Sequence, residues 1–166
     1  MLRIGIAGAS SLGKSTLAEN LSRVCDAKVV SQDDFYLPES ELPTLEGTTR
    51  PNLDSPNSFD HERYIRALAQ RAAEGNVIGE GLYAFSSQPE FFTHRILLSA
   101  PLELTYERRQ AGYENDELYR AVIASMRLMI EEQRKTADLV IELDPHVSTR
   151  DVLDQSLALI EGRRVS

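Results

Sequence analysis

The sequence has little of what secreted and membrane proteins require. Its 166 residues include a single cysteine, Cys25, so no internal disulfide can form. We expect Cys25 to act as a small buried hydrophobic residue, because it continues the helical pattern that precedes it. No apolar stretch is long enough for the hydrophobic region of a signal peptide or for a membrane span. These absences predict a protein of the reducing cytoplasm.

Basic residues are scarce relative to acidic ones. The chain has 18 Lys and Arg against 26 Asp and Glu, which gives a formal net charge of −8. Nucleic acids and anionic membranes bind to basic surfaces, so this balance argues against both as partners. A small molecule is the expected partner, and any phosphate on it must be held by local geometry. Nothing in the sequence indicates an oligomeric state.

The length and the alternating patterns predict one α/β domain over residues 1–166. Short apolar runs rich in β-branched residues are typical of strands buried on both faces, and apolar residues recur between them at helical spacing. This alternation predicts a five-stranded parallel sheet with helices on both faces. The expected strands span residues 2–7, 28–31, 76–79, 95–99 and 139–143, and the helical positions include Leu17, Leu21, Val24, Ile65, Leu68, Ala72, Leu118, Val122, Met129, Val152, Ser156 and Ile160.

One motif predicts a nucleotide site. Residues 8–16 follow the first expected strand and match G-x-x-x-x-G-K-[ST], the phosphate-binding loop between a strand and a helix. Its glycines let backbone N–H groups converge on phosphate oxygens, Lys14 reaches the β- and γ-phosphates, and Ser15 offers its hydroxyl to Mg²⁺. A glycine turn that only caps a helix is the alternative, and a chance match is expected in about one sequence in a hundred. The predicted nucleotide-binding residues of the loop are Gly8, Ala9, Ser10, Ser11, Leu12, Gly13, Lys14, Ser15 and Thr16.

A phosphate-binding loop alone does not separate kinases from GTPases and from motor or transport ATPases. The chain has no N-K-x-D string for guanine, no D-x-x-G switch and no L-S-G-G-Q signature. We therefore predict a phosphotransferase that acts on a small molecule.

Two polar segments interrupt the alternating pattern. Residues 33–60 contain four of the seven prolines, which excludes a continuous helix there. Residues 108–117 are charged, contain a glycine and lie between an apolar strand and a helix, where we expect a mobile loop. Such loops in α/β proteins carry substrates and lids. We interpret residues 33–60 as the segment that binds the phosphoryl acceptor and residues 108–117 as a lid.

Four strings of the chain, in the same order, resemble the uridine kinase and nicotinamide riboside kinase group. They are residues 4–18, the string Val-Ser-Gln-Asp-Asp-Phe-Tyr at 30–36, the string Asn-Leu-Asp-Ser-Pro-Asn-Ser-Phe-Asp at 52–60, and Gly-Glu-Gly at 79–81. The resemblance runs from residue 1 to about residue 85 and continues more loosely to 137–141. It implies a P-loop kinase that uses ATP and Mg²⁺ to phosphorylate a primary hydroxyl of a nucleoside-like or sugar-containing molecule.

The resemblance implies roles for three carboxylates. Asp33 is implied to orient the acceptor hydroxyl or take its proton, which a carboxylate within hydrogen-bond reach can do. Glu80 is implied to hold Mg²⁺, through water, because Mg²⁺ takes few protein ligands. Asp54 is implied to bind ribose hydroxyls, since two carboxylate oxygens suit a vicinal diol. The alternatives are turn-capping side chains at Asp33 and Asp54 and a solvated strand-end acid at Glu80.

Cations are expected from the lid. By the same resemblance, Arg108 binds the nucleotide phosphates and Arg109 joins Lys14 and Asp33 as a catalytic residue, because guanidinium groups match phosphate geometry. An exposed helix end is the alternative for the two arginines.

Aromatic residues offer a surface on which a flat base could stack. We predict this role for Tyr36 and Tyr113 and expect Tyr83, Phe85, Phe91 and Phe92 in the core. His61 and His94 lack the spacing of a metal site.

Two features differ from the resembling family. Gly75 leads almost directly to Glu80, so the insertion that precedes this glutamate in uridine kinases is missing, and Leu53 stands where nicotinamide riboside kinases have an aromatic residue. The acceptor therefore stays open. The alternatives are a kinase of a non-nucleoside metabolite such as pantothenate or glycerate, and a nucleotide-binding regulator with weak ATPase activity.

Overall fold

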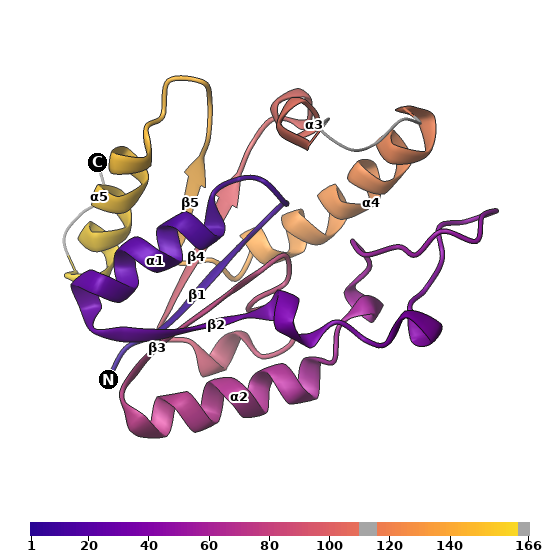
Figure 1. The fold of residues 1–166 in the computed structure, drawn as a ribbon. Coiled ribbons are helices and arrows are strands. Elements are labelled where there is room, and N and C mark those ends of the chain that lie inside the picture. Colours follow the sequence, from indigo (N-terminus) through magenta and orange to yellow (C-terminus); the bar gives the residue numbers. More distant parts are fainter. Residues whose placement is uncertain (110–115, 163–166) are drawn as a thin grey trace.

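Five parallel strands form one sheet, as the sequence predicts. The structure, a computed structural model, describes residues 1–109 and 116–162. The spatial order of the strands is β2-β3-β1-β4-β5 (Figure 1), and the predicted strands are confirmed to within two residues at each end. Their bounds are Arg3–Gly8 for β1, Ala27–Ser31 for β2, Asn76–Gly81 for β3, His94–Ser99 for β4 and Leu139–Glu142 for β5.

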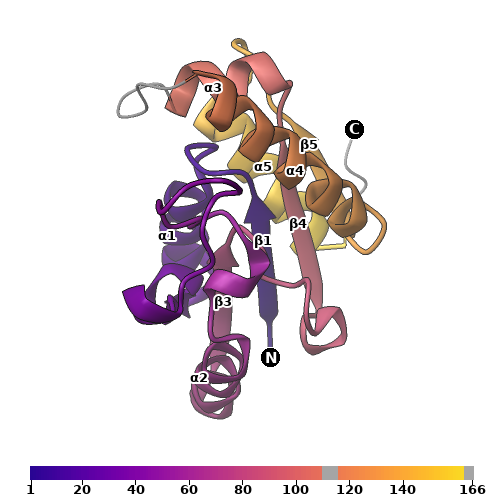
Figure 2. The same ribbon diagram turned by 90° about the vertical axis from the view of Figure 1, so that its right-hand side faces the viewer.

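Helices cover both faces of this sheet. Figures 1 and 2 show α1 and α5 side by side on one face and α2 and α4 on the other. These four helices were predicted from the sequence, whereas a fifth helix, α3, was not. Their bounds are Lys14–Cys25 for α1, His61–Glu74 for α2, Leu102–Arg109 for α3, Asp116–Arg134 for α4 and Thr149–Ile160 for α5.

Side-chain caps begin two of the helices. The Asp60 carboxylate accepts a hydrogen bond from the backbone N–H of Arg63 at 2.9 Å, which caps α2. Ser148 and Asp151 form a reciprocal capping box at the start of α5. These caps satisfy backbone donors that a helix start leaves without an intrahelical partner.

The apolar core has one layer on each face of the sheet. On the α1 face, Leu17 and Leu21 pack with strand residues, whereas Val24 is 60% exposed, so the prediction that Val24 continues the apolar stripe is wrong. Cys25 is half-buried against this layer, and burial, followed by the charge of Glu161, raises the pKa of its thiol. The layer on the α2 face includes Tyr64, Leu68, Ala72, Phe85 and Phe92.

Residues 33–60 form an arm that extends from the sheet between β2 and α2 (Figure 1). The arm contains no continuous helix, as its prolines predict, and its only helical pieces are short 3₁₀ turns at Glu39–Glu41, Pro56–Ser58 and, at its start, Gln32–Phe35. A further 3₁₀ turn, Pro89–Phe91, precedes β4. Single antiparallel bridges join Tyr36 to Phe59 and Thr44 to Pro51, so the two ends of the arm meet at the sheet.

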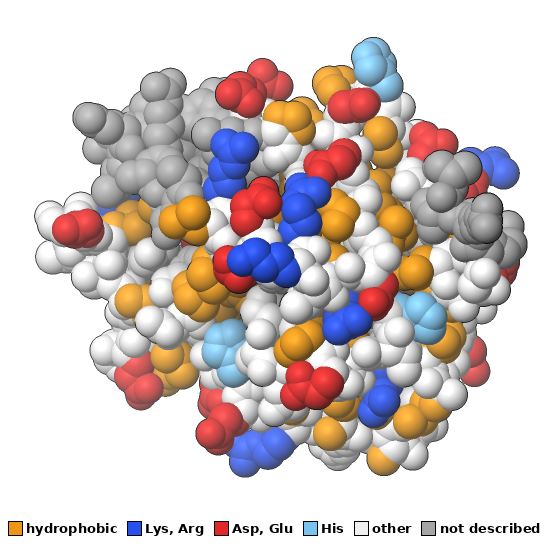
Figure 3. Space-filling model, turned by 180° about the vertical axis from the view of Figure 1, so that it is seen from behind, with side chains coloured by type: hydrophobic (Ala, Val, Ile, Leu, Met, Phe, Trp, Pro, Cys, Tyr) orange, Lys and Arg blue, Asp and Glu red, His pale blue; other side chains and the backbone are white. Residues whose placement is uncertain are grey.

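The surface carries mixed charge. On the face shown in Figure 3, acidic and basic side chains are interspersed. Within residues 1–109 and 116–162, no helix combines the length and the apolar character that a membrane crossing requires.

Candidate active site

The loop between β1 and α1 has the backbone that close contact with a phosphate requires. Gly8 has a φ of 145°, and a Cβ there would overlap the backbone carbonyl of Leu98 in β4. Gly13, with a φ of 89°, is the N-cap residue of α1 and has no side chain to occupy the first N–H groups of the helix. Ser11 also adopts a left-handed conformation, with a φ of 64°, which is uncommon outside glycine. The loop is therefore shaped as an anion cradle.

The side chains of this loop differ in burial, and so in what each can offer a nucleotide. Ala9 and Leu12 are 2% and 3% exposed, so they can offer a nucleotide only their backbone. Lys14 Nζ donates to the carbonyl oxygen of Ala9 at 3.0 Å, which holds the ammonium group across the loop. Ser15 and Thr16 are exposed in the first turn of α1, and Ser10 is half-buried.

Glu80 is held by its neighbour on β2. The two strands pair in parallel with Ser31 opposite Glu80, and the Ser31 hydroxyl donates to Glu80 Oε1 at 2.6 Å. Glu80 is 5% exposed and also lies opposite Ile6 of β1, two residues before the loop begins at Gly8. The carboxylate is thus buried beside the phosphate-binding loop, so it is not a freely solvated strand-end acid.

Asp33 lies in the turn that follows β2, with its side chain exposed. Its backbone N–H donates to Ser31 Oγ at 3.4 Å. Asp33, Glu80 and the phosphate-binding loop therefore occupy the carboxyl ends of three neighbouring strands, β2, β3 and β1. In open parallel sheets, this edge is where ligands bind.

Asp54 reaches the same edge from the arm, and a chain of hydrogen bonds connects it to the sheet. The backbone carbonyl of Asp54 accepts from the Tyr83 hydroxyl at 2.5 Å, and the Tyr83 backbone N–H donates to Gln32 Oε1 at 2.9 Å. Gln32 is fully buried and fills the space that a Cβ at Gly81 would occupy. Tyr83 was predicted only as a core residue, and Gln32 was not predicted as a site residue. The signal that could have found Gln32 was its position beside Asp33 in a matched string.

Tyr36 is packed against the opposite end of the arm. Its ring centroid lies 4.4 Å from that of Phe59, with 32° between the planes, and its hydroxyl donates to the Leu53 carbonyl at 3.3 Å. Phe59 in turn packs with Leu82 and Met126. One face of the Tyr36 ring is therefore occupied by protein, so a base cannot stack on that face.

The segment predicted as a lid, residues 108–117, is helical at both ends. Arg108 and Arg109 lie in the last turn of α3, and α4 begins at Asp116, so the prediction of a loop over all of 108–117 is wrong at both ends. Pro101 precedes a run of good helix formers, which accounts for α3. The side chains of both arginines, and Tyr113 as a whole, lie outside the part of the chain that the structure describes.

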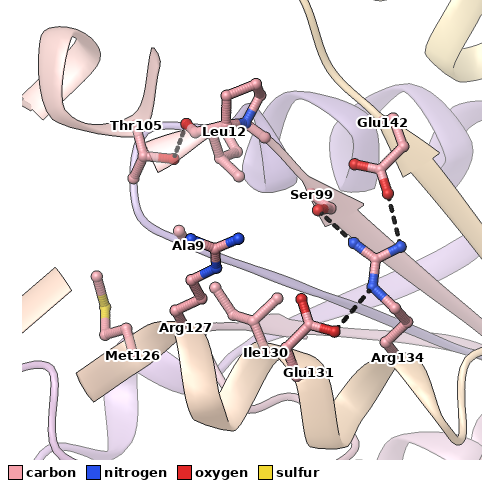
Figure 4. Close-up of a pocket in the computed structure, with 12 residues that line it drawn as sticks. Ala9, Leu12, Ser99, Thr105, Met126, Arg127, Ile130, Glu131, Arg134 and Glu142 are labelled. Carbon is pink, nitrogen blue, oxygen red and sulfur yellow. Dashed lines mark hydrogen bonds and ion pairs between the residues drawn. The ribbon is translucent and has the colours of Figure 1, made fainter. Parts of the chain in front are cut away.

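A cavity of about 230 Å³ lies between the loop, the end of β4, α3 and α4 (Figure 4). Arg127 of α4 points into it toward Ala9. Arg134, about two turns further along the same face of α4, donates to Ser99 Oγ at 2.8 Å and to Glu142 Oε1 at 2.6 Å. Burial acts to raise the pKa of Glu142, but its hydrogen bonds with Arg134 and Ser99 outweigh burial and leave the pKa below its usual range. Neither arginine was predicted as a site residue, although their spacing of seven on a predicted helix was a signal that both lie on one face.

The oxygen donors at this edge fit Mg²⁺. No group of three or more His, Cys, Asp and Glu side chains suited to a metal occurs within the described ranges. Mg²⁺ does not need such a group, because it keeps several waters and binds through one or two protein oxygens plus substrate phosphates. The Glu80 carboxylate near the end of β3 and the Ser15 hydroxyl in the first turn of α1 are hard oxygen donors of this kind.

The strand order, the helices on both faces and the loop between β1 and α1 together form a P-loop fold. No protein-family model matches the chain. Its fold matches that of shikimate kinase from Acinetobacter baumannii with a TM-score of 0.65 and 17% identity, over 100% of this chain and 96% of that one. This match confirms the predicted fold class.

Sequence relatives narrow the class. The chain is 28% identical over 158 residues to uridine kinase of Aliivibrio fischeri, which covers 84% of this chain and 73% of that enzyme. It is 37% identical over 98 residues to nicotinamide riboside kinase of Eremothecium gossypii, which covers 52% of this chain and 41% of that enzyme. These relatives confirm the resemblance predicted from the sequence and identify the chain as an enzyme, a small-molecule kinase similar to these two.

Proposed function

We propose that the protein transfers the γ-phosphoryl group of Mg-ATP to a primary hydroxyl of a nucleoside-like or other sugar-containing small molecule. The observation that carries the proposal is that three groups of residues lie at the same edge of the sheet. The phosphate-binding loop, Asp33 and Glu80 meet at the carboxyl ends of three adjacent strands. Phosphoryl transfer requires a donor, a cation and an acceptor hydroxyl held in line, with little covalent chemistry from the protein.

On the donor side, the loop from Gly8 to Thr16 binds the phosphates through its backbone. Lys14 exchanges the Ala9 carbonyl, to which it is bonded at 3.0 Å, for a phosphate oxygen. Ser15 and Glu80 would hold Mg²⁺, Glu80 through a water molecule. When bound, Mg²⁺ supplies charge neutralisation for the phosphates.

On the acceptor side, Asp33 orients the reacting hydroxyl and takes its proton. Its exposure leaves it accessible to a substrate from solvent. Asp54 binds a pair of neighbouring hydroxyls, and its backbone bond to Tyr83 supports that position. We retain Tyr36 and Tyr113 as the residues proposed to stack on a flat base.

Cations complete the site from the side of α3 and α4. We retain Arg108 and Arg109 as residues that reach the phosphates, now from the end of a helix. Arg127 adds a third cation, supported by its direction into the cavity beside Ala9 (Figure 4). Guanidinium groups suit the charge that develops on a transferring phosphoryl group.

We further propose that the protein works in the cytoplasm as one domain over residues 1–166, on small molecules alone. The single cysteine and the net charge of −8 support this proposal.

The test is acceptor-dependent turnover. The purified protein is incubated with Mg-ATP and separately with nucleosides, sugars, pantothenate and glycerate, and ADP is measured. ADP that forms only with a nucleoside or another sugar-containing acceptor supports the proposal. ADP that forms equally without any acceptor, or nucleotide binding without turnover, contradicts it, and phosphorylation of pantothenate or glycerate alone overturns the acceptor class.

A further inference from the structure

The Ser31 side chain links two of the proposed active-site carboxylates. Its hydroxyl donates to Glu80 Oε1 at 2.6 Å and accepts from the backbone N–H of Asp33 at 3.4 Å. Ser31 is the last residue of β2 and the N-cap of the 3₁₀ turn that carries Asp33. One hydroxyl group therefore contacts both the Glu80 carboxylate on β3 and a backbone N–H of the turn that carries Asp33.

Burial makes the bond to Glu80 difficult to replace. Glu80 is 5% exposed, so water has little access to take the place of a missing hydroxyl. The strand register makes Ser31 the hydrogen-bond partner of Glu80, because the two residues lie opposite each other in the β2–β3 pair. With Oε1 bound in this way, the carboxylate is held in one rotamer and presents its second oxygen in one direction.

We propose that Ser31 is a positioning residue that fixes the Glu80 carboxylate for Mg²⁺ and sets the start of the turn that carries Asp33. This inference rests on the proposed function, in which Glu80 serves the metal. Partners that orient a metal-binding carboxylate typically contribute 10–100-fold to metal affinity or activity. The expected role is therefore indirect, and its effect must pass through Glu80.

The test measures how strongly Mg²⁺ tightens nucleotide binding, with no acceptor present. Calorimetry gives the dissociation constant of the non-hydrolysable analogue AMP-PNP with Mg²⁺ and with EDTA. The matched control is Ser22→Ala, which removes a serine hydroxyl that donates to a carbonyl of its own helix, that of Glu19 in α1, at 2.8 Å. Far-UV circular dichroism and the thermal midpoint verify that each variant folds.

We expect Mg²⁺ to tighten binding equally in the wild type and in Ser22→Ala. Ser31→Ala should lose about tenfold or more of this tightening, with the affinity in EDTA unchanged. Ser31→Thr, which keeps a hydroxyl, should retain most of it and also serves if the alanine variant does not fold. In a Glu80→Gln background, Ser31→Ala should cause no further loss.

Two results would overturn the proposal. One is an unchanged Mg²⁺ dependence in Ser31→Ala, and the other is an equal loss in the Glu80→Gln background. The proposed function fails separately. If the wild type phosphorylates no acceptor while these binding differences persist, the kinase reaction is contradicted and the role of Ser31 stands.

Discussion

The hydrogen bond from Tyr83 to Asp54 determines how firmly the arm is attached to the sheet. Tyr83 is 1% exposed, and its hydroxyl donates to the Asp54 backbone carbonyl at 2.5 Å. Tyr83→Phe removes this donor, and Asp54, whose carbonyl loses the hydrogen bond, is only 9% exposed to water. Leaving a buried acceptor without its donor costs about 1–3 kcal/mol. Because some water can enter beside Asp54, we expect the free energy of unfolding to fall by about 1–2 kcal/mol.

Tyr36→Phe is the matched control for this prediction. The Tyr36 hydroxyl donates to the carbonyl of Leu53, the residue before Asp54, but at 3.3 Å and in an exposed position. Water can replace that bond, so we expect a change within about 0.5 kcal/mol.

Urea unfolding followed by circular dichroism measures both variants. Tyr83→Phe should shift the midpoint without changing the slope. In thermal unfolding, each kcal/mol should lower the midpoint by about 2–4 °C for a chain of this size. Equal free energies of unfolding for the two variants would refute the argument that the buried bond anchors the arm.

Three further predictions follow from the site and from the edge of the sheet. Lys14→Ala should abolish turnover, because it removes ~3 kcal/mol or more of transition-state stabilisation, and should leave the unfolding midpoint unchanged. A folded variant with a near-normal rate would contradict the assignment of residues 8–16 as the phosphate-binding loop. In steady-state kinetics, Asp33→Asn should lower kcat far more than it weakens ATP binding, whereas Asp54→Ala should mainly raise the KM of the acceptor, and identical profiles would contradict the separate roles. Hydrogen bonds from Arg95 hold the pKa of Asp138 below its usual range, although burial opposes them. The resulting stability is complete above the unfolded pKa of about 3.9 and is lost as the pH falls through the lower folded value. Asp138→Asn should therefore cost about 1 kcal/mol at pH 7 and flatten the decline in unfolding free energy below about pH 4, as measured by urea titrations at several pH values.

Local signals in the sequence predicted most of the scaffold. The central strands β3, β1 and β4 are short apolar runs that are mostly buried, so periodicity identifies them without knowledge of their neighbours. The edge strands β2 and β5 are partly exposed, so the prediction that all five are buried on both faces is wrong for these two. The phosphate-binding loop is equally local, because its glycines and Lys14 lie within a few residues of one another. Val24 shows the limit of this reasoning, since it keeps the helical spacing of α1 and yet is 60% exposed.

The parts that could not be predicted depend on which strands become neighbours. Ser31 bonds to Glu80 across 49 positions of sequence, and Tyr83 reaches Asp54 across 29. The first contact follows from the pairing of β2 with β3 in register, and the second from how the arm packs against the segment after β3. No single segment of the sequence encodes either arrangement. The direction of Arg127 into the cavity depends in the same way on how α4 packs beside the loop.

The fate of the γ-phosphoryl group tests the central claim most directly. The protein is incubated with Mg²⁺, γ-labelled ATP and a nucleoside, and the label is followed by chromatography and mass spectrometry. The account predicts that the label appears on a primary hydroxyl of the acceptor, and that Lys14→Ala and EDTA both prevent this transfer. Label that appears only in inorganic phosphate, at the same rate with and without an acceptor, would contradict a kinase and would indicate a simple ATPase.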